Sequence, residues 1–198
     1  MKRTLLATTA LLCLATGAAL AAPVNVGVIL GFTGPLESIT PGMAGSAELA
    51  FKEASDSGKL PGGATLNPVR ADSTRAAAAA ATTAATNLVT GEGVVAILGA
   101  DCSGVTTAIA NNVAVPNGVV MISPSATSPA LSTIADDGYF FRTSPSDARQ
   151  GQILAEIVKE KGIDQVAITF TNNDYGKGLA DSLAAAYQEL GGKVALSA

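Results

Sequence analysis

The chain has 198 residues, of which 48% are hydrophobic and 14% are charged, and its formal net charge is −4. This composition is typical of a folded globular protein and lies far from that of disordered chains. The acidic balance argues against nucleic acid or an anionic membrane surface as a partner. The sequence has no histidine, so it can form neither a serine–histidine catalytic pair nor a histidine metal site.

Residues 1–21 follow the pattern of a secretory signal peptide. Lys2 and Arg3 precede a long apolar stretch, which ends in the small residues "ALA" at 19–21. A transmembrane anchor is the alternative, but the apolar stretch is short for a span, which needs ~20 residues. We therefore expect cleavage and export to the periplasm. The mature chain would carry a net charge of −6, because both of the lost charges are positive.

Cys102 is the cysteine that the mature chain would keep, because Cys13 lies in the predicted signal peptide. No intramolecular disulfide is then expected. A single cysteine in an oxidising compartment is either buried and inert or reactive. We expect Cys102 to be buried.

Apolar strand patterns alternate with helical patterns along the rest of the chain. Predicted strands cover residues 24–30, 64–71, 94–98, 119–122, 139–145, 165–170 and 193–197. Predicted helices cover residues 42–57, 72–91, 105–114, 146–162 and 177–192. Asp72 or Ser73 can cap the second helix, and Ser146 or Asp147 can cap the fourth. Pro68 predicts an edge position or a late start for the second strand. Strands that are apolar on both faces and alternate with helices indicate parallel sheets flanked by helices.

The alternation restarts after residue 143, which divides the α/β chain into two predicted lobes. Residues 22–143 form a Rossmann-like first lobe, and residues 144–198 begin a second one. Two strands and two helices bury too little surface to be stable alone. We therefore expect the second lobe to be incomplete and the isolated chain to be a fragment of low stability.

Loops rich in hydroxyl groups follow the predicted strands, where open parallel sheets bind their ligands. In "GADCSG", Ser103 either caps the helix that begins there or joins the helix amides in binding a carboxylate. In "SPSATSP", Thr127 either holds a bend or offers its hydroxyl and amide to a ligand. The carbonyls of Ser125 and Ala126 could accept from an ammonium group.

Six motifs in the right order make the chain resemble a known family. They are "VGVILGFTGPL", "GSAELAFKEA", "ILGADCSG", "MISPSATSPAL", "FFRTSPSDARQG" and "NNDYGKGLADSL". The chain resembles the leucine/isoleucine/valine-binding proteins, the periplasmic components of branched-chain amino acid ABC transporters with the type I periplasmic-binding fold. The resemblance runs from residue 24 to the end of the chain.

The resemblance implies a role for four residues at the site. Ser103 would donate its hydroxyl and amide to the α-carboxylate of an amino acid. The carbonyl of Ser125 would accept from the α-ammonium group. Thr127 would give its amide to the carboxylate and its hydroxyl to the ammonium group, and Tyr175 would be the aromatic contact of the second lobe.

Two positions at the site depart from the family pattern. Asp101 stands where the family often has an apolar residue, and Ile39 lies near a position where the family often has a tyrosine. The carboxylate that would meet the ammonium group from the second lobe is expected beyond Ala198. The nature of the pocket for the ligand side chain is therefore open.

We expect an extracytoplasmic binding protein that delivers an amino acid of the branched-chain or hydrophobic type, or a related small carboxylated solute, to an ABC permease by hinge closure. A sensor domain of the same fold and a truncated chain without function are the alternatives. An enzyme is disfavoured because the loops carry no acid–base pair. We expect a monomer that needs no cofactor and no metal.

Overall fold

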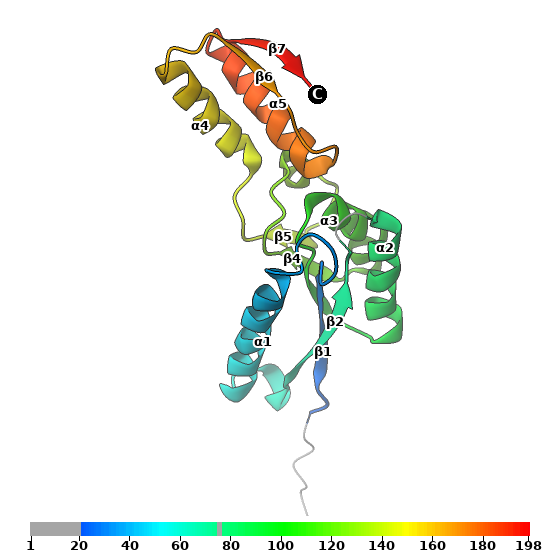
Figure 1. Cartoon of the computed structure of the whole chain (residues 1–198). Coiled ribbons are helices and arrows are strands. Elements are labelled where there is room, and N and C mark those ends of the chain that lie inside the picture. Colours follow the sequence, from blue (N-terminus) through cyan, green and yellow to red (C-terminus); the bar gives the residue numbers. More distant parts are fainter. Residues whose placement is uncertain (1–20, 75–76) are drawn as a thin grey trace, which may run out of the picture.

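The first sheet of the molecule is parallel and has the strand order β2–β1–β3–β4–β5 (Figure 1). The structure is a computed structural model that describes residues 21–74 and 77–198, so the predicted signal peptide lies outside the described residues, apart from Ala21. The strands are β1 (Val24–Leu30), β2 (Leu66–Asp72), β3 (Ala96–Gly99), β4 (Val120–Ser123) and β5 (Phe140–Arg142). The predicted parallel pairing is confirmed, and β2 with its Pro68 lies at the edge as expected.

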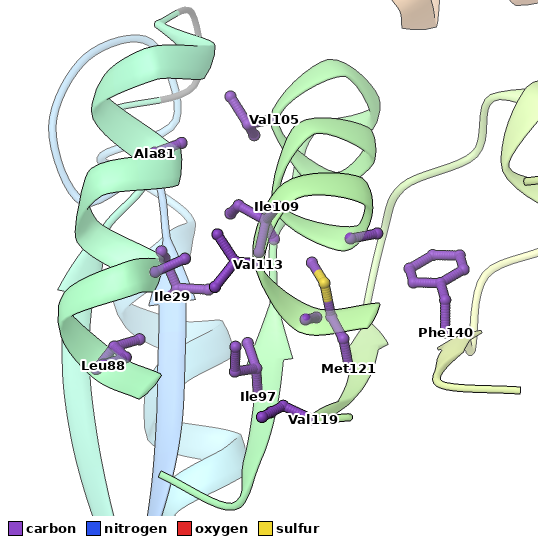
Figure 2. Packing of buried hydrophobic residues seen from close by; sticks show 14 of the residues in the cluster. Ile29, Ala81, Leu88, Ile97, Val105, Ile109, Val113, Val119, Met121 and Phe140 are labelled. Atoms are coloured by element: carbon purple, nitrogen blue, oxygen red, sulfur yellow. The ribbon is translucent and has the colours of Figure 1, made fainter. Parts of the chain in front are cut away.

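Helices cover both faces of this sheet. Successive side chains of β1 point to opposite faces, so its apolar residues need a packing partner on each side. Val28 and Leu30 pack on one face with Ala44 of α1 (Thr40–Asp56). Ile29 points to the other face and packs with residues of α2 (Ala78–Thr86) and α3 (Ser103–Ile109) (Figure 2).

The alanine-rich α2 lies close against the sheet. Ala81 and Ala85 are fully buried, which small side chains permit without a gap. The π-helical turns Asn87–Gly91 and Ala110–Ala114 extend α2 and α3, and Leu88 and Val113 of these turns complete the same core (Figure 2).

The predicted cap of α2 is wrong. The helix begins at Ala78 after Ala77, and no side chain caps it. Asp72 is instead the last residue of β2, and its carboxylate accepts from the N–H groups of Phe32 at 3.0 Å and Thr74 at 2.8 Å. Ser73 is fully buried and donates to Asp101 Oδ1 at 3.2 Å. Both side chains thus form hydrogen bonds at the end of the sheet, and neither caps the helix.

A second, two-stranded parallel sheet follows the first. It consists of β6 (Gln165–Ile168) and β7 (Lys193–Ser197). Two helices accompany it, α4 (Asp147–Glu160) and α5 (Asp174–Glu189). These elements lie beyond the end of the first sheet near α3 (Figure 1). As predicted, Ser146 caps α4 by accepting from the N–H of Ala148 at 3.2 Å.

The remaining short helices are single 3₁₀ turns at Pro61–Gly63, Val115–Asn117 and Pro129–Ser132. Among the helices that the structure describes, none is both long and apolar enough to cross a membrane.

Helices α4 and α5 pack closely at Gly151, which gives a test of this contact. A Cβ atom at Gly151 would lie 2.7 Å from the backbone nitrogen of Leu183, so Gly151→Ala should lower the free energy of unfolding by about 1–3 kcal/mol through overpacking. Gly45→Ala in α1 is the matched control, because nothing lies within 4 Å of its added methyl group. It should leave stability unchanged or raise it by up to about 1 kcal/mol. Urea unfolding measures both, and equal effects would contradict the close contact.

Candidate functional site

A cleft of about 730 Å³ lies between the carboxyl edge of the first sheet and the start of α5. Five segments line it: the β1–α1 loop, the start of α2 at Ala78, the β3–α3 loop with the first turn of α3, the "SPSATSP" loop, and residues 172–175. Six of the seven predicted site residues are among the lining residues, namely Ile39, Asp101, Ser103, Ser125, Thr127 and Tyr175. The common edge of parallel strands explains why distant loops meet here.

Ala126, the seventh, lies behind the cleft rather than in its wall. Its side chain is fully buried. Its carbonyl accepts from Arg142 Nη1 at 3.3 Å and from the hydroxyl of Ser144 at 3.1 Å. Arg142 also donates to the carbonyl of Ser128 at 2.8 Å. This carbonyl therefore holds the loop in place, and it is already satisfied without an ammonium group.

Ser103 is the first residue of α3 and is 1% exposed. Cys102 occupies the cap position, and no side chain caps the helix there, so the capping interpretation of Ser103 is wrong. Its Oγ instead accepts from the N–H of Ser128 at 3.1 Å. A hydroxyl has one proton to donate besides its acceptor lone pairs, so this bond leaves the proton of Ser103 available for an anionic group in the cleft.

The hydroxyl of Thr127 is a donor within the protein, whereas that of Ser103 is an acceptor. Its hydroxyl donates to Asp147 Oδ2 at 2.8 Å, and the N–H of Asp147 donates back to the carbonyl of Thr127 at 2.9 Å. Asp147 is 2% exposed and is the first residue of α4. Because the proton of Thr127 is committed to a carboxylate, its oxygen is left as an acceptor, which suits an ammonium group.

Ser125 ties the two central loops of the site together. Its hydroxyl donates to the backbone carbonyl of Asp101 at 2.9 Å. Ser123, the first residue of the loop and the last of β4, accepts from the N–H of Ala126 at 3.0 Å. The loop is thus fixed by its own hydroxyl groups, and its backbone rather than its serine side chains is left to face a ligand.

Asp101 is a nearly buried carboxylate in the cleft wall, with 5% of its surface exposed. Its Oδ1 accepts from the N–H of Gly31 at 3.0 Å and from Ser73. Its Oδ2 lies 3.7 Å from Cys102 Sγ. The expected burial of Cys102 is wrong: the residue is partly exposed because it lines the same cleft.

Asp72 fixes the β1–α1 loop, which carries Ile39 at the rim of the cleft. Burial alone would raise the pKa of Asp72. The hydroxyl of Thr33 and the N–H groups of Thr74, Thr33 and Phe32 all donate to the carboxylate and together hold its pKa below the ordinary value. Ile39 itself is 56% exposed, and Tyr175 on the facing side is 42% exposed. Both side chains line the cleft and remain largely open to solvent.

Sequence reasoning missed Asp147 as a partner of the site. It identified the residue only as a possible helix cap, because 20 positions separate it from Thr127. Within the described parts of the chain, no group of three or more acidic or cysteine side chains could hold a metal ion. The described wall of the cleft therefore offers hydrogen-bond donors and acceptors from hydroxyl, carboxylate and amide groups.

Comparison with known proteins agrees with this fold and site. The family model described as periplasmic binding protein matches residues 23–198, and the chain belongs to that family. Leu/Ile/Val-binding protein homolog 3 of Brucella melitensis is 30% identical over 171 residues, which cover 86% of this chain and 45% of the relative. The chemotactic substrate-binding protein BasB of Halobacterium salinarum is 34% identical over 82% of this chain and 40% of its own.

A solved structure shows the same architecture. The substrate-binding protein LivJ of the branched-chain amino acid transporter of Streptococcus pneumoniae, in complex with isoleucine, matches with a TM-score of 0.75 and 31% identity. The match covers 89% of this chain and 49% of LivJ. This confirms the predicted type I periplasmic-binding architecture of parallel sheets flanked by helices. The chain spans about half the length of the relatives that it matches.

The carboxylate of Asp72 gives a test of how the rim is held. Asp72→Asn should lower the free energy of unfolding at about pH 7 by about 1–3 kcal/mol, because it weakens bonds from several donors. Since folding lowers the pKa of Asp72, its stabilisation is complete above the ordinary value of 3.8 and is lost as pH falls through the folded value.

Urea unfolding over a pH series should therefore show the gap between wild type and Asp72→Asn closing as the pH falls below 3.8. The exposed Asp137→Asn is the control and should leave stability nearly unchanged at every pH. A gap that widens in acid would contradict the assignment.

Proposed function

We propose that this chain is the ligand-binding part of an extracytoplasmic binding protein that delivers an amino acid, or a related small carboxylated solute, to the permease of an ABC transporter. One observation carries the proposal: Ser103 and Thr127 line the same cleft with hydroxyl groups of opposite polarity. A pair of this kind suits the carboxylate and the ammonium group of one amino acid.

The proposed ligand contacts follow from this polarity. The α-carboxylate accepts from the hydroxyl and the N–H of Ser103 and from the N–H of Thr127. The N–H of Ser103 is suited to this role because the first amides of a helix have no partner within it. The α-ammonium group donates to the hydroxyl oxygen of Thr127 and to the carbonyl of Ser125. Ile39 and Tyr175 then cover the ligand from the two sides of the cleft.

Binding in this proposal is followed by closure rather than by chemistry. We place the boundary of the two lobes after residue 143, so that residues 22–143 and 144–198 move as separate units about the connection. A ligand that contacts both lobes stabilises the closed arrangement. No catalytic residue is assigned, since the sequence has no histidine that could act as the base for Cys102 in the cleft wall.

The cellular setting of the proposal is the periplasm. The signal-peptide pattern of residues 1–21 supports export, and several of the relatives that match are Leu/Ile/Val-binding proteins or their homologs. The exported protein acts as a monomer, with the permease as its protein partner, and needs neither cofactor nor metal.

A sensory role is the second candidate, because BasB is a substrate-binding protein of a chemotactic signal transduction system. Deletion of the gene separates the two. Loss of ligand uptake supports transport, whereas loss of movement toward the ligand with normal uptake supports sensing.

The ligand contacts are tested by removing one hydroxyl at a time. Ser103→Ala and Thr127→Val should each weaken binding about tenfold or more, because each leaves a charged group of the ligand short of one hydrogen bond. A thermal-shift screen of the purified full chain against the common amino acids and aromatic carboxylates identifies the ligand, and calorimetry then measures the variants.

Ser46→Ala is the matched control, since its hydroxyl donates to the carbonyl of Gly42 on an exposed turn of α1. It should bind as the wild type does. Unchanged binding in both Ser103→Ala and Thr127→Val would refute the assignment, and the absence of any binding by the wild-type chain would refute the function itself.

A further inference from the structure

We infer that Asp101 selects ligands whose side chain carries an N–H or O–H hydrogen-bond donor and disfavours purely aliphatic ones. The inference rests on the proposed function and narrows it. The position makes Asp101 suitable for this role, because it lies two residues before Ser103 and lines the same cleft. A ligand whose carboxylate is held by Ser103 would have its remaining atoms close to this side chain.

The two oxygens of Asp101 are used unequally. Oδ1 accepts from the N–H of Gly31 at 3.0 Å and from the hydroxyl of Ser73 at 3.2 Å. Oδ2 is 3.7 Å from Cys102 Sγ, and a thiol is a weak donor. An ionised carboxylate has about four acceptor sites, so Oδ2 has unused capacity for a strong donor.

The surroundings give this carboxylate little compensation for its burial. No lysine or arginine is among the residues that line the cleft in the described structure, and the second acidic residue there is Asp174. A carboxylate with 5% exposure, in a cleft wall whose described residues include no lysine or arginine, is costly to dehydrate. A ligand that donates a hydrogen bond to Oδ2 offsets that cost. A methyl group displaces the remaining water but forms no hydrogen bond in its place.

A purely structural role of Asp101 is the competing explanation. The bonds through Oδ1 join the ends of β1, β2 and β3, and this contribution does not depend on any ligand. Asp101→Asn separates the two roles. The amide oxygen can still accept from Gly31 and Ser73, while an NH₂ group replaces Oδ2 and turns the free acceptor into a donor.

The experiment compares amino acids of matched shape on the purified full chain by saturation-transfer NMR titration. 2,4-Diaminobutyrate and norvaline differ by an ammonium group in place of a methyl group, and asparagine and leucine differ by a planar amide in place of a branched alkyl group. In the wild type, 2,4-diaminobutyrate should bind at least about tenfold more tightly than norvaline, and asparagine at least about tenfold more tightly than leucine.

The Asp101→Asn variant should reduce the preference for 2,4-diaminobutyrate over norvaline by at least about tenfold. This pair is decisive, because an ammonium group has only donors and cannot accept from the new amide. The side-chain amide of asparagine, in contrast, has a carbonyl oxygen that can accept from it. Ser73→Ala is the control: it removes one donor to Oδ1 and should leave the preference unchanged.

Each failure has a distinct meaning. If leucine and norvaline bind as tightly as their partners, or if Asp101→Asn keeps the wild-type preference, the inference is overturned while amino acid binding stands. If the wild-type chain binds none of the four and nothing in the wider amino acid screen, the proposed function falls together with it. The comparison within the wild type remains informative even if Asp101→Asn fails to fold.

Discussion

The carbonyl of Ala100 is the point on which the geometry of the site depends. It accepts from the hydroxyl of Thr106 at 3.0 Å and from that of Ser123 at 2.5 Å, and both side chains are fully buried. A buried carbonyl must be satisfied within the protein, and here the first turn of α3 and the end of β4 satisfy it together. These two bonds hold the "SPSATSP" loop beside Ser103, so that the two halves of the proposed ligand shell face one cleft.

Hydroxyl groups in this protein thus have two roles: some fix loops, and others leave a donor or an acceptor in the cleft. The partner that receives the hydroxyl proton distinguishes the two roles. Those of Thr106 and Ser125 donate to backbone carbonyls and fix loops. Those of Ser103 and Thr127 are oriented by neighbours so that one keeps a proton and the other keeps lone pairs for the cleft. In the proposed site, Asp147 acts on the ligand only indirectly, through the orientation of the Thr127 hydroxyl. Asp101 stands apart, because it is a carboxylate rather than a hydroxyl group in the wall of the cleft.

Much of the fold and the position of the candidate site could be predicted from the sequence. The wrong predictions have a common cause, which is that they depend on contacts between distant parts of the chain. The order of strands and helices and the edge position of β2 followed from local patterns, and parallel pairing placed the hydroxyl-rich loops at one edge. The helix caps predicted at Asp72, Ser73 and Ser103 rested on local sequence alone. In the structure, the side chains of these residues instead form hydrogen bonds with residues far away in the sequence. The partnership of Thr127 with Asp147 could not be predicted, because it depends on how the chain returns after β5. The partial exposure of Cys102 likewise depends on a cleft that only the folded chain forms.

The pairing of Thr127 with Asp147 bears on the proposed closure. It joins the ligand-binding loop to the first residue of α4, so this contact lies at the connection between the two sheets rather than across the open side of the cleft. Asp174 and Tyr175, at the start of α5, line the cleft opposite Ser103 and Gly104. Asp174 already lies beside Gly104, since a Cβ atom at Gly104 would be 3.6 Å from Asp174 Oδ2. A rotation about the connection would therefore change this contact between α5 and α3 while Thr127 kept its orientation. In the proposed closure, the orientation of the Thr127 hydroxyl is thus independent of how close α5 lies to α3.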